Sequence, residues 1–427
     1  MSVARIGSVR LWQVLDSRGN PTIACRVTST TGTSASAIAP CGASTGSHEA
    51  AFVRDGGPAF SGLAVQAHLA RVEPSLAAAV TGCPVEDPWE LTRRVRELDP
   101  DPLLRQVGGH AATAVSIATW LLASRLRDVA PYEVVAEWMG CSGPSIPLPM
   151  VNIVSGGAHA GGAVGIQDVL AVPVGAGSFR EAIELVWLAR SGTAAQLERL
   201  GFSTALVADE GGLAAALGSD TAAIRAVADG IEQQGLSGRV GIALDVAASD
   251  SLAGGRYRMD GSALDATELV ARHAAWADEF PLLSLEDPAA EDDDEGWTLH
   301  AAALPGVQIV GDDRYATTLA RVQAGIAAHE ADAVLVKVNQ AGTLADALDV
   351  VRAARSAGWS VVVSARSGDT EESWLADLAV GSGADQIKVG STTRSERTSK
   401  WNRLLELEAL DALPFVTPLP LPRSAPR

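Results

Sequence analysis

The sequence predicts an α/β protein in which a small N-terminal α+β domain precedes a larger barrel domain. Short strands and turns fill residues 1 to about 60, and apolar side chains at helical spacing follow from about 61 to 140. Beyond residue 141, short apolar strands alternate with helix-like segments, a pattern typical of parallel βα units. About eight such strands fit a closed (β/α)8 barrel, while a doubly wound open sheet remains the alternative.

Two Pro-rich segments set the expected domain boundaries. The stretch "CSGPSIPLPM", residues 141–150, is rich in Gly, Ser and Pro and is predicted to be a junction. The C-terminal "LPFVTPLPLPRSAPR" lacks a packing pattern and is predicted to be a flexible tail. We therefore expect an N-terminal domain at 1–140, a catalytic barrel at 141–412 and a tail at 413–427.

Charged residues stand at or just past the carboxyl ends of the predicted barrel strands. The predicted strands are "VLAVPV", "ALVADEGG", "VGIALDVAAS", "LLSLEDP", "VQIVGDD", "AVLVKVNQ", "SVVVSARSG" and "DQIKVG". The charged residues at their ends are Glu210, Asp245, Glu286, Asp312, Lys337, Arg366 and Lys388. In a parallel barrel these ends meet at one mouth, where catalytic groups collect.

Composition excludes several classes of function. With 427 residues, 47% hydrophobic and 20% charged, the chain is typical of a globular protein. A net charge of −18 repels phosphate backbones and anionic lipids, so we expect neither nucleic-acid nor membrane binding. The four widely spaced cysteines predict neither a disulfide framework nor a zinc site. The N-terminus lacks a signal-peptide pattern, and no run of about 18 apolar residues predicts a membrane span, so we expect a cytoplasmic protein.

A lysine stands inside an apolar strand in "DAVLVKVNQAG", residues 332–342. The chain has 33 Lys and Arg residues, of which only Lys337, Lys388 and Lys400 are lysines. A desolvated lysine can lose its proton and act as a general base, whereas arginine cannot. An ordinary strand-end lysine that reaches water or a carboxylate is the alternative. Lys388, in "DQIKVG", shares the setting of Lys337, which favours a functional role.

Three carboxylates at successive strand ends, Asp245, Glu286 and Asp312, would repel one another without a cation between them. Oxygen ligands without nearby His or Cys suit Mg²⁺. Metal ions stabilise the charge that builds up when a carbon acid next to a carboxylate loses its proton. Lys337 beside such a metal is therefore a candidate for the base that takes this proton.

Motifs spread over nearly the whole chain resemble those of enolase. They run from "VLDSRGNPT" near the start to "RSER" at 394–397, and include "GASTGSHEA", "GGAHAG", "IQD", "DEGG", "ALDVAAS", "SLEDPAAEDDDEGW", "GDD", "LVKVNQAGT", "RSGDTEE" and "QIK". The resemblance implies a lyase of glycolysis that reversibly dehydrates 2-phosphoglycerate to phosphoenolpyruvate, with two Mg²⁺ ions per active site. It also implies a homodimer, a barrel of ββαα(βα)6 order and a lid loop on the N-terminal domain.

The resemblance also implies roles for individual residues. Lys337 would be the base that takes the C2 proton, and Glu210 the acid that assists departure of the C3 hydroxide. The first Mg²⁺ would be held by Asp245, Glu286 and Asp312, and the second with the help of Ser44 on the lid loop. Glu286 would also lie against the substrate. The other residues expected to contact substrate are His159, Gln167, Asp168, Arg366, Ser367 and Lys388.

Two positions depart from the family pattern. Asp168 stands where the family has Glu, and Ala365 stands where the family has His beside the phosphate-binding arginine. These departures leave two enzymatic alternatives open: enolase itself, or an enolase-like enzyme of specialised metabolism such as a carboxyphosphonoenolpyruvate synthase. A third alternative, a non-catalytic interaction protein, is disfavoured by the intact base, acid and carboxylates. The acidic run 291–296 is interpreted as a solvated loop.

Overall fold

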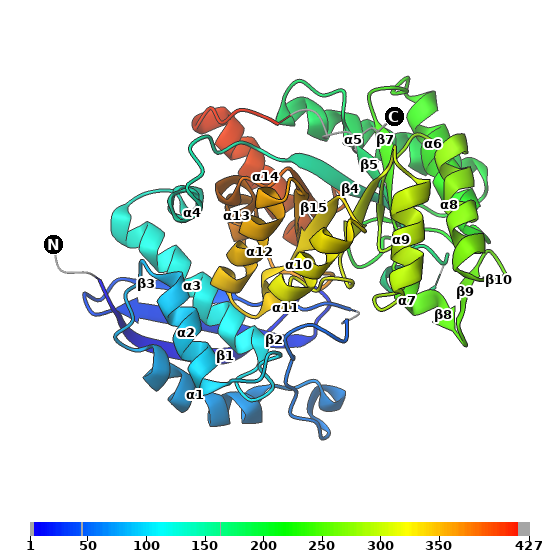
Figure 1. Ribbon diagram of the computed structural model, residues 1–427. Coiled ribbons are helices and arrows are strands. Elements are labelled where there is room, and N and C mark those ends of the chain that lie inside the picture. The colour runs from blue at the N-terminus through cyan, green and yellow to red at the C-terminus, as the bar shows by residue number, and fades with distance from the viewer. Residues whose placement is uncertain (1–3, 44–45, 163, 417–427) are drawn as a thin grey trace.

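The computed structural model describes residues 4–43, 46–162 and 164–416. In Figure 1 the blue and cyan N-terminal elements lie beside the barrel. Their sheet is an antiparallel meander of β1 (Ile6–Leu15), β2 (Pro21–Ser29) and β3 (Ser34–Ile38). The β1–β2 turn forms because Asp16 Oδ1 accepts hydrogen bonds from the backbone N–H groups of Arg18 (2.8 Å) and Asn20 (2.9 Å). The "DSRGN" motif therefore encodes this hairpin.

Among its described residues, the N-terminal domain also contains α-helices. They are α1 (Gln66–Val80), α2 (Pro88–Leu98), α3 (Gly109–Arg127) and α4 (Pro131–Met139). Helix α3 is rich in alanine and buried over most of its surface, because it lies against β2 and β3 and also contacts the short helix α11 (Val338–Ala341) of the barrel domain. The α+β domain predicted from the sequence is confirmed.

The barrel closes through eight strands, with β15 pairing back onto β4. They are β4 (Leu148–Ser155), β5 (Asp168–Val172), β7 (Gly241–Asp245), β11 (Leu282–Glu286), β12 (Gln308–Gly311), β13 (Ala333–Val336), β14 (Ser360–Ser364) and β15 (Gln386–Gly390). Strand β5 runs antiparallel to both neighbours, and the other barrel pairs are parallel. The predicted barrel is confirmed, and the open sheet is excluded.

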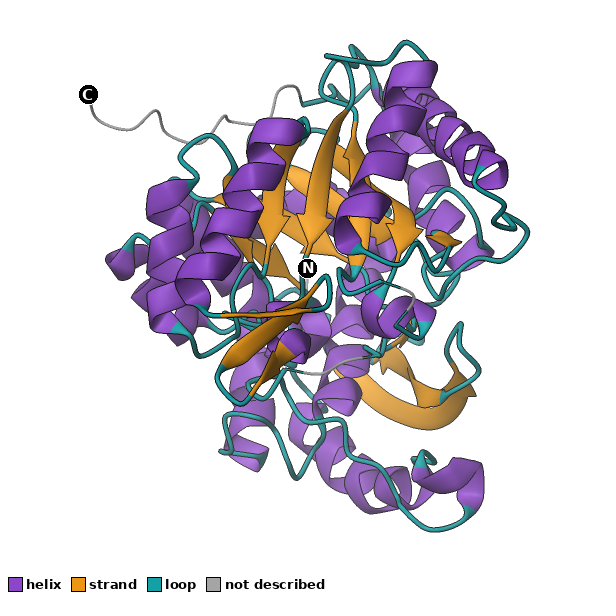
Figure 2. Cartoon of the chain, turned by 90° about the vertical axis from the view of Figure 1, so that its right-hand side faces the viewer, coloured by secondary structure: helices purple, strands orange, loops and turns teal. Residues whose placement is uncertain are grey.

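Helices surround the barrel, as Figure 2 shows. They are α5 (Phe179–Arg199), α6 (Asp220–Gln233), α8 (Ala266–Glu279), α9 (Asp294–Ala303), α10 (Leu319–Ala328), α12 (Leu344–Ser356), α13 (Trp374–Ser382) and α14 (Ser395–Leu410). Side chains that cap helix N-termini by accepting a backbone N–H belong to Ser178, Ser219, Asp265, Asp293 and Thr343. The resulting order, ββαα(βα)6, is the one that the resemblance implied.

Two expectations about the barrel strands are wrong. The segment 205–212 is no barrel strand: its residues form turns, and only the two-residue β6 (Leu213–Ala214) after it pairs with the end of β4. The first barrel strand, β4, is not among the predicted strands, and part of it falls in the predicted junction. The strands are also not all parallel. The described residues between β4 and β5 form only a short 3-10 helix (Gly157–Ala160), too short to cross over the barrel, so β5 returns antiparallel.

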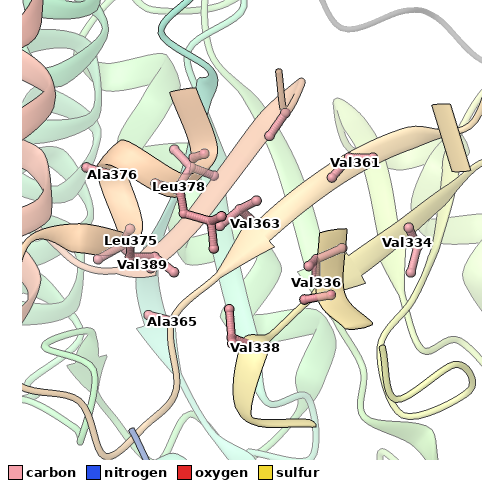
Figure 3. Close-up of a cluster of buried hydrophobic side chains, with 14 of the residues drawn as sticks. Val334, Val336, Val338, Val361, Val363, Ala365, Leu375, Ala376, Leu378 and Val389 are labelled. Carbon is pink, nitrogen blue, oxygen red and sulfur yellow. The ribbon is translucent and has the colours of Figure 1, made fainter. Parts of the chain in front are cut away.

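Side chains of the barrel strands alternate between the barrel interior and the helical layer. Figure 3 shows an apolar cluster between β13, β14, β15 and α13 that includes Val334, Val336, Val361, Val363, Leu375, Leu378 and Val389. The intervening Ala333, Leu335 and Val362 belong to a separate apolar cluster with Leu148, Leu170 and Ala243. Because both faces are covered, the strands are mostly apolar, and their few polar side chains, such as Ser284 and Gln386, are buried.

The described end of the chain returns to the start of the barrel. Ile146 donates its N–H to Pro414 O (2.8 Å), and Val416 donates to Ile146 O (2.9 Å). Residues 417–427 of the predicted tail lie outside the described residues. Within the described ranges, no helix is long and apolar enough to cross a membrane.

Candidate active site

The charged residues predicted at the strand ends, with the exception of Glu286, line one cavity of about 30 Å³. Its lining comprises Gly42, Ala43, His159, Gln167, Glu210, Asp245, Ala247, Asp287, Asp312, Asp313, Lys337, Ser364, Ala365, Arg366, Ser367 and Lys388. Gly42 and Ala43 come from the N-terminal domain, so both parts of the chain build the cavity. Of the residues predicted from the sequence, Glu210 arrives from the turn before β6 and not from a strand end.

Lys388 lies between two carboxylates inside the barrel mouth. Its Nζ contacts Asp245 Oδ2 at 2.6 Å and Glu286 Oε2 at 2.7 Å, and Gln167 Nε2 donates to Asp245 Oδ2 at 2.9 Å. Burial raises the pKa of Glu286 well above its usual value, and the neighbouring Asp245 charge adds to this rise. For Asp245, burial is outweighed by Lys388, which lowers its pKa. Lys388 therefore compensates negative charge on both carboxylates.

Lys337 pairs with Asp312 beside this cluster. Its side chain is 12% exposed, and its Nζ donates to Asp312 Oδ2. Burial is the largest single influence and lowers the pKa of Lys337, and Arg366 and Lys388 lower it further. The Asp312 and Glu286 carboxylates raise it, and the net direction is upward. In this arrangement the Lys337 ammonium is protonated, and the Asp312 carboxylate stabilises its positive charge.

His159, Asp168 and Glu210 form a second buried group at the mouth. Asp168 is fully buried, and its Oδ1 accepts hydrogen bonds from Asn152 Nδ2 and from Ser155 Oγ (3.1 Å). Its Oδ2 lies 3.2 Å from His159 Nδ1, and His159 Nε2 lies 3.9 Å from Glu210 Oε1. Burial opposes a charge on His159, but Asp168 and then Glu210 outweigh it and raise the pKa of His159 to about 9.

The loop after β14 carries Arg366 and Ser367 into the cavity. Arg366 is 4% exposed and makes two hydrogen bonds to Glu49, at 2.9 and 3.0 Å. Ser367 Oγ accepts from the backbone N–H of Ala43 at 2.6 Å. Arg397 of α14 fixes the loop from behind, because it donates to Arg366 O (2.7 Å) and Ser367 O (2.5 Å).

A hard divalent cation fits the donor set of Asp245, Glu286 and Asp312. All three side chains are buried, and Glu286 Oε1 has no hydrogen-bond partner among the described residues. A buried carboxylate oxygen without a partner is costly unless a cation binds it. Among the described residues, Asp287, Asp312 and Asp313 bring ligand atoms within 4.8 Å of one another, whereas Asp245, Glu286 and Asp312 do not form such a compact group and are bridged by Lys388 and Lys337. Asp287, however, already accepts the backbone N–H groups of Asp312 (2.9 Å) and Asp313 (2.8 Å), so it positions the loop after β12. Ser44, the predicted ligand of a second ion, lies outside the described residues.

Sequence reasoning missed several residues that support the cavity. Glu49 is buried against Arg366, and Asn152 and Ser155 hold Asp168. The third lysine, Lys400, is also buried, and its Nζ contacts Asp369 Oδ1 at 2.6 Å beneath the Arg366 loop. The rarity of lysine was a usable signal for Lys400, since all three lysines turn out to be paired inside the protein.

Comparison with protein-family models supports a relationship over most of the chain. The model described as the enolase N-terminal domain matches residues 6–135. The model described as the enolase C-terminal TIM barrel domain matches residues 144–413. The two matches are consecutive along the chain and correspond to the α+β part and the barrel described above.

Proposed function

The chain belongs to the enolase family, and from this premise we propose that it catalyses the reversible dehydration of 2-phosphoglycerate to phosphoenolpyruvate. The observation that carries the proposal is the convergence of Lys337 and Glu210 on one cavity that is also lined by the buried carboxylates of Asp245 and Asp312, with Glu286 behind Lys388. The reaction needs a base at C2, an acid at C3 and positive charge around the substrate carboxylate. The cavity supplies a candidate for each requirement.

Lys337 is proposed to take the C2 proton. It lies directly after β13, where its backbone N–H is fixed by Thr317 Oγ1 at 2.9 Å. A lysine ammonium releases its proton more readily when other cations lie near it and when its carboxylate partner is neutralised. Arg366 and Lys388 already act in this direction on the pKa of Lys337, while Asp312 and, to a smaller extent, Glu286 oppose release.

Glu210 is proposed to protonate the departing C3 hydroxide, with His159 beside it. The chain places Glu210 by a backbone contact, in which Ser391 N–H donates to Glu210 O at 2.8 Å. Gly211, at φ +83°, makes the turn after it, and a Cβ there would lie 2.6 Å from Thr393 O. The "DEGG" motif therefore combines the proposed acid with the glycine that its turn requires.

The substrate anion is proposed to bind to the cationic side of the cavity. Arg366 presents a planar guanidinium, which matches a phosphate group better than a lysine does. Ser367, Gln167 and Lys388 lie around it on the cavity wall, and Asp168 and His159 lie on the side of Glu210. These are the residues that we expect to contact substrate.

Mg²⁺ is the proposed cofactor, held by Asp245, Glu286 and Asp312. When bound, it would neutralise these carboxylates and stabilise negative charge on the substrate carboxylate. A second Mg²⁺ held with Ser44 and a homodimeric state are proposed on the family resemblance. Calorimetric titration gives the number of ions per chain, and light scattering gives the mass of the assembly.

The direct test measures two steps of the reaction separately. Wild-type protein with Mg²⁺ should convert 2-phosphoglycerate to the enol product, followed by ultraviolet absorbance, and exchange the C2 proton with solvent deuterium, followed by NMR. Glu210→Gln should lose dehydration but retain exchange, because proton abstraction precedes departure of hydroxide. If the wild type binds Mg²⁺ but neither dehydrates nor exchanges the substrate, the proposal is wrong.

A second candidate, an enolase-type enzyme such as a carboxyphosphonoenolpyruvate synthase, is favoured by Ala365. This residue lines the cavity beside Arg366 with a side chain of one carbon, where the family pattern has an imidazole. A phosphorus group with an additional carboxyl substituent would then have room. Under this candidate, phosphonoformate binds more tightly than inorganic phosphate, and Ala365→His reverses the preference.

A further inference from the structure

Glu49 is a buried carboxylate that the proposed reaction does not yet use. It lies in the N-terminal domain between β3 and α1 and is 7% exposed. Arg366 Nη1 donates to its Oε2 at 2.9 Å, and Arg366 Nη2 donates to its Oε1 at 3.0 Å. Two parallel hydrogen bonds to a carboxylate fix both the position and the plane of a guanidinium. The N-terminal domain therefore sets the orientation of the arginine that we expect to bind the phosphate.

The same carboxylate is linked to the proposed metal ligand Asp312. Gln340 Nε2 donates to Glu49 Oε1 at 3.4 Å and to Asp312 Oδ1 at 2.9 Å. Thr317 Oγ1 donates to Gln340 Oε1 at 2.7 Å, which fixes the orientation of the amide. A continuous set of buried polar contacts thus joins Arg366, Glu49, Gln340 and Asp312.

We propose that Glu49 is a positioning residue for the dehydration, because it holds the Arg366 guanidinium in the plane that the transition state requires and, through Gln340, steadies Asp312. The inference rests on the proposed function. An arginine side chain has several rotatable bonds, and a phosphate bound off its intended position misplaces C2 relative to Lys337. Glu49 also compensates the charge of Arg366, which lines the cavity together with the cations of Lys337 and Lys388.

A purely structural ion pair between the two domains is the alternative to exclude. The domains are also joined here by a backbone hydrogen bond from Ala50 N–H to Gln340 O at 2.8 Å, which a Glu49 variant keeps. A positioning role predicts a specific kinetic pattern for Glu49→Gln. Loss of the negative charge of Glu49 favours binding of the substrate phosphate in the ground state. Loss of the fixed orientation of the Arg366 guanidinium slows the chemical step.

The first measurement is the steady-state kinetics of Glu49→Gln on 2-phosphoglycerate. We expect kcat to fall about tenfold to a hundredfold, while KM does not rise, since a hydrogen bond to a charged group has this magnitude when it acts in the transition state. Glu97→Gln is the matched control, because Glu97 pairs with Arg93 on the exposed side of α2. The control should match the wild type. A raised KM with unchanged kcat, unchanged kinetics, or an equal loss in the control overturns the inference.

The second measurement follows the Arg366 guanidinium directly by ¹⁵N NMR and is independent of turnover. In the wild type the two Nη groups should give separate signals, because the paired guanidinium rotates slowly about its Nε–Cζ bond. In Glu49→Gln the rotation should become fast and the signals merge. Equal rotation in both proteins overturns the inference. Absence of dehydration by the wild type instead overturns the proposed function, and the NMR result still decides whether Glu49 holds Arg366.

Discussion

His159 should carry a positive charge at neutral pH. The Asp168→Asn substitution should remove most of the preference of this imidazole for its charged form. The imidazole is 8% exposed, so burial alone would favour its neutral form. Its Nδ1 lies 3.2 Å from Asp168 Oδ2, and its Nε2 lies 3.9 Å from Glu210 Oε1. These carboxylates raise the pKa of His159 from 6.5 to about 9, and Asp168 contributes more of the rise than Glu210 does.

The magnitude follows from the difference between the two pKa values. A rise from 6.5 to about 9 is about 2.5 pH units, and at about 1.4 kcal/mol per unit this corresponds to roughly 3 kcal/mol. Because the pKa of His159 is higher in the folded protein, this stabilisation is fully present below about pH 6.5 and is lost as the pH rises through about 9. Burial also raises the pKa of Asp168, and this cost offsets part of the gain.

The assay is an NMR titration of the histidine C2 protons in metal-free protein, with His159→Gln to assign the signal. The assignment is favourable because burial lowers the pKa of four other histidines: His68, His110, His273 and His300. Asp168→Asn should lower the pKa of His159 by more than one unit. Asp292→Asn is the matched control, since Asp292 contacts a different, partly exposed histidine, His48, at 3.3 Å. The reasoning is refuted if His159 titrates near 6.5 in the wild type, or identically in the wild type and Asp168→Asn.

Four further predictions concern the reaction and its ligands. Lys337→Arg should abolish C2 deuterium exchange measured by NMR, because guanidinium stays protonated; retained exchange would exclude Lys337 as the base. In calorimetry, Asp312→Asn should weaken Mg²⁺ binding at least tenfold more than Asp292→Asn in the acidic loop, and equal effects would identify the wrong cluster. Ala365→His combined with Asp168→Glu should raise kcat on 2-phosphoglycerate more than either change alone. Because both positions are buried, the double variant should also have a free energy of unfolding lower by about 1–3 kcal/mol, measured by denaturant titration. Finally, Mg²⁺ should tighten the binding of inorganic phosphate in calorimetry, and unchanged affinity would contradict the charge balance proposed for the cavity.

Local sequence patterns predicted the barrel because its strands are covered on both faces. An apolar run that ends in a charged residue, as at Asp245 or Glu286, marks both a buried strand and its exit at the barrel mouth. The same pattern failed for residues 205–212, where a short apolar stretch before "DEGG" resembles a strand but forms turns. The first strand, β4, begins inside a Pro-rich stretch. Because proline is typical of junctions and turns, the sequence pattern there did not indicate a strand.

The supporting contacts of the cavity could not be predicted from local patterns, because they join residues that are distant along the chain. Glu49 meets Arg366 across 317 residues, and Lys400 meets Asp369 across 31. Neither Glu49 nor Lys400 stands at a strand end, so neither was singled out. Only the assembled fold shows that Lys400 lies under the Arg366 loop, where burial lowers its pKa although the Asp369 carboxylate opposes the shift.

The charge balance of the cavity explains why a cation and an anionic substrate should bind together. Each cation expected to contact substrate is already paired: Lys388 with Asp245 and Glu286, and Arg366 with Glu49. A substrate anion that approached alone would have to displace these carboxylates, and a displaced carboxylate in a buried site is costly. Asp245 and Glu286 would hold a hard cation, Lys388 would then be available to the anion, and the anion would in turn compensate the added positive charge. Affinity for each ligand must then rise with the other, since coupling between two binding sites is reciprocal.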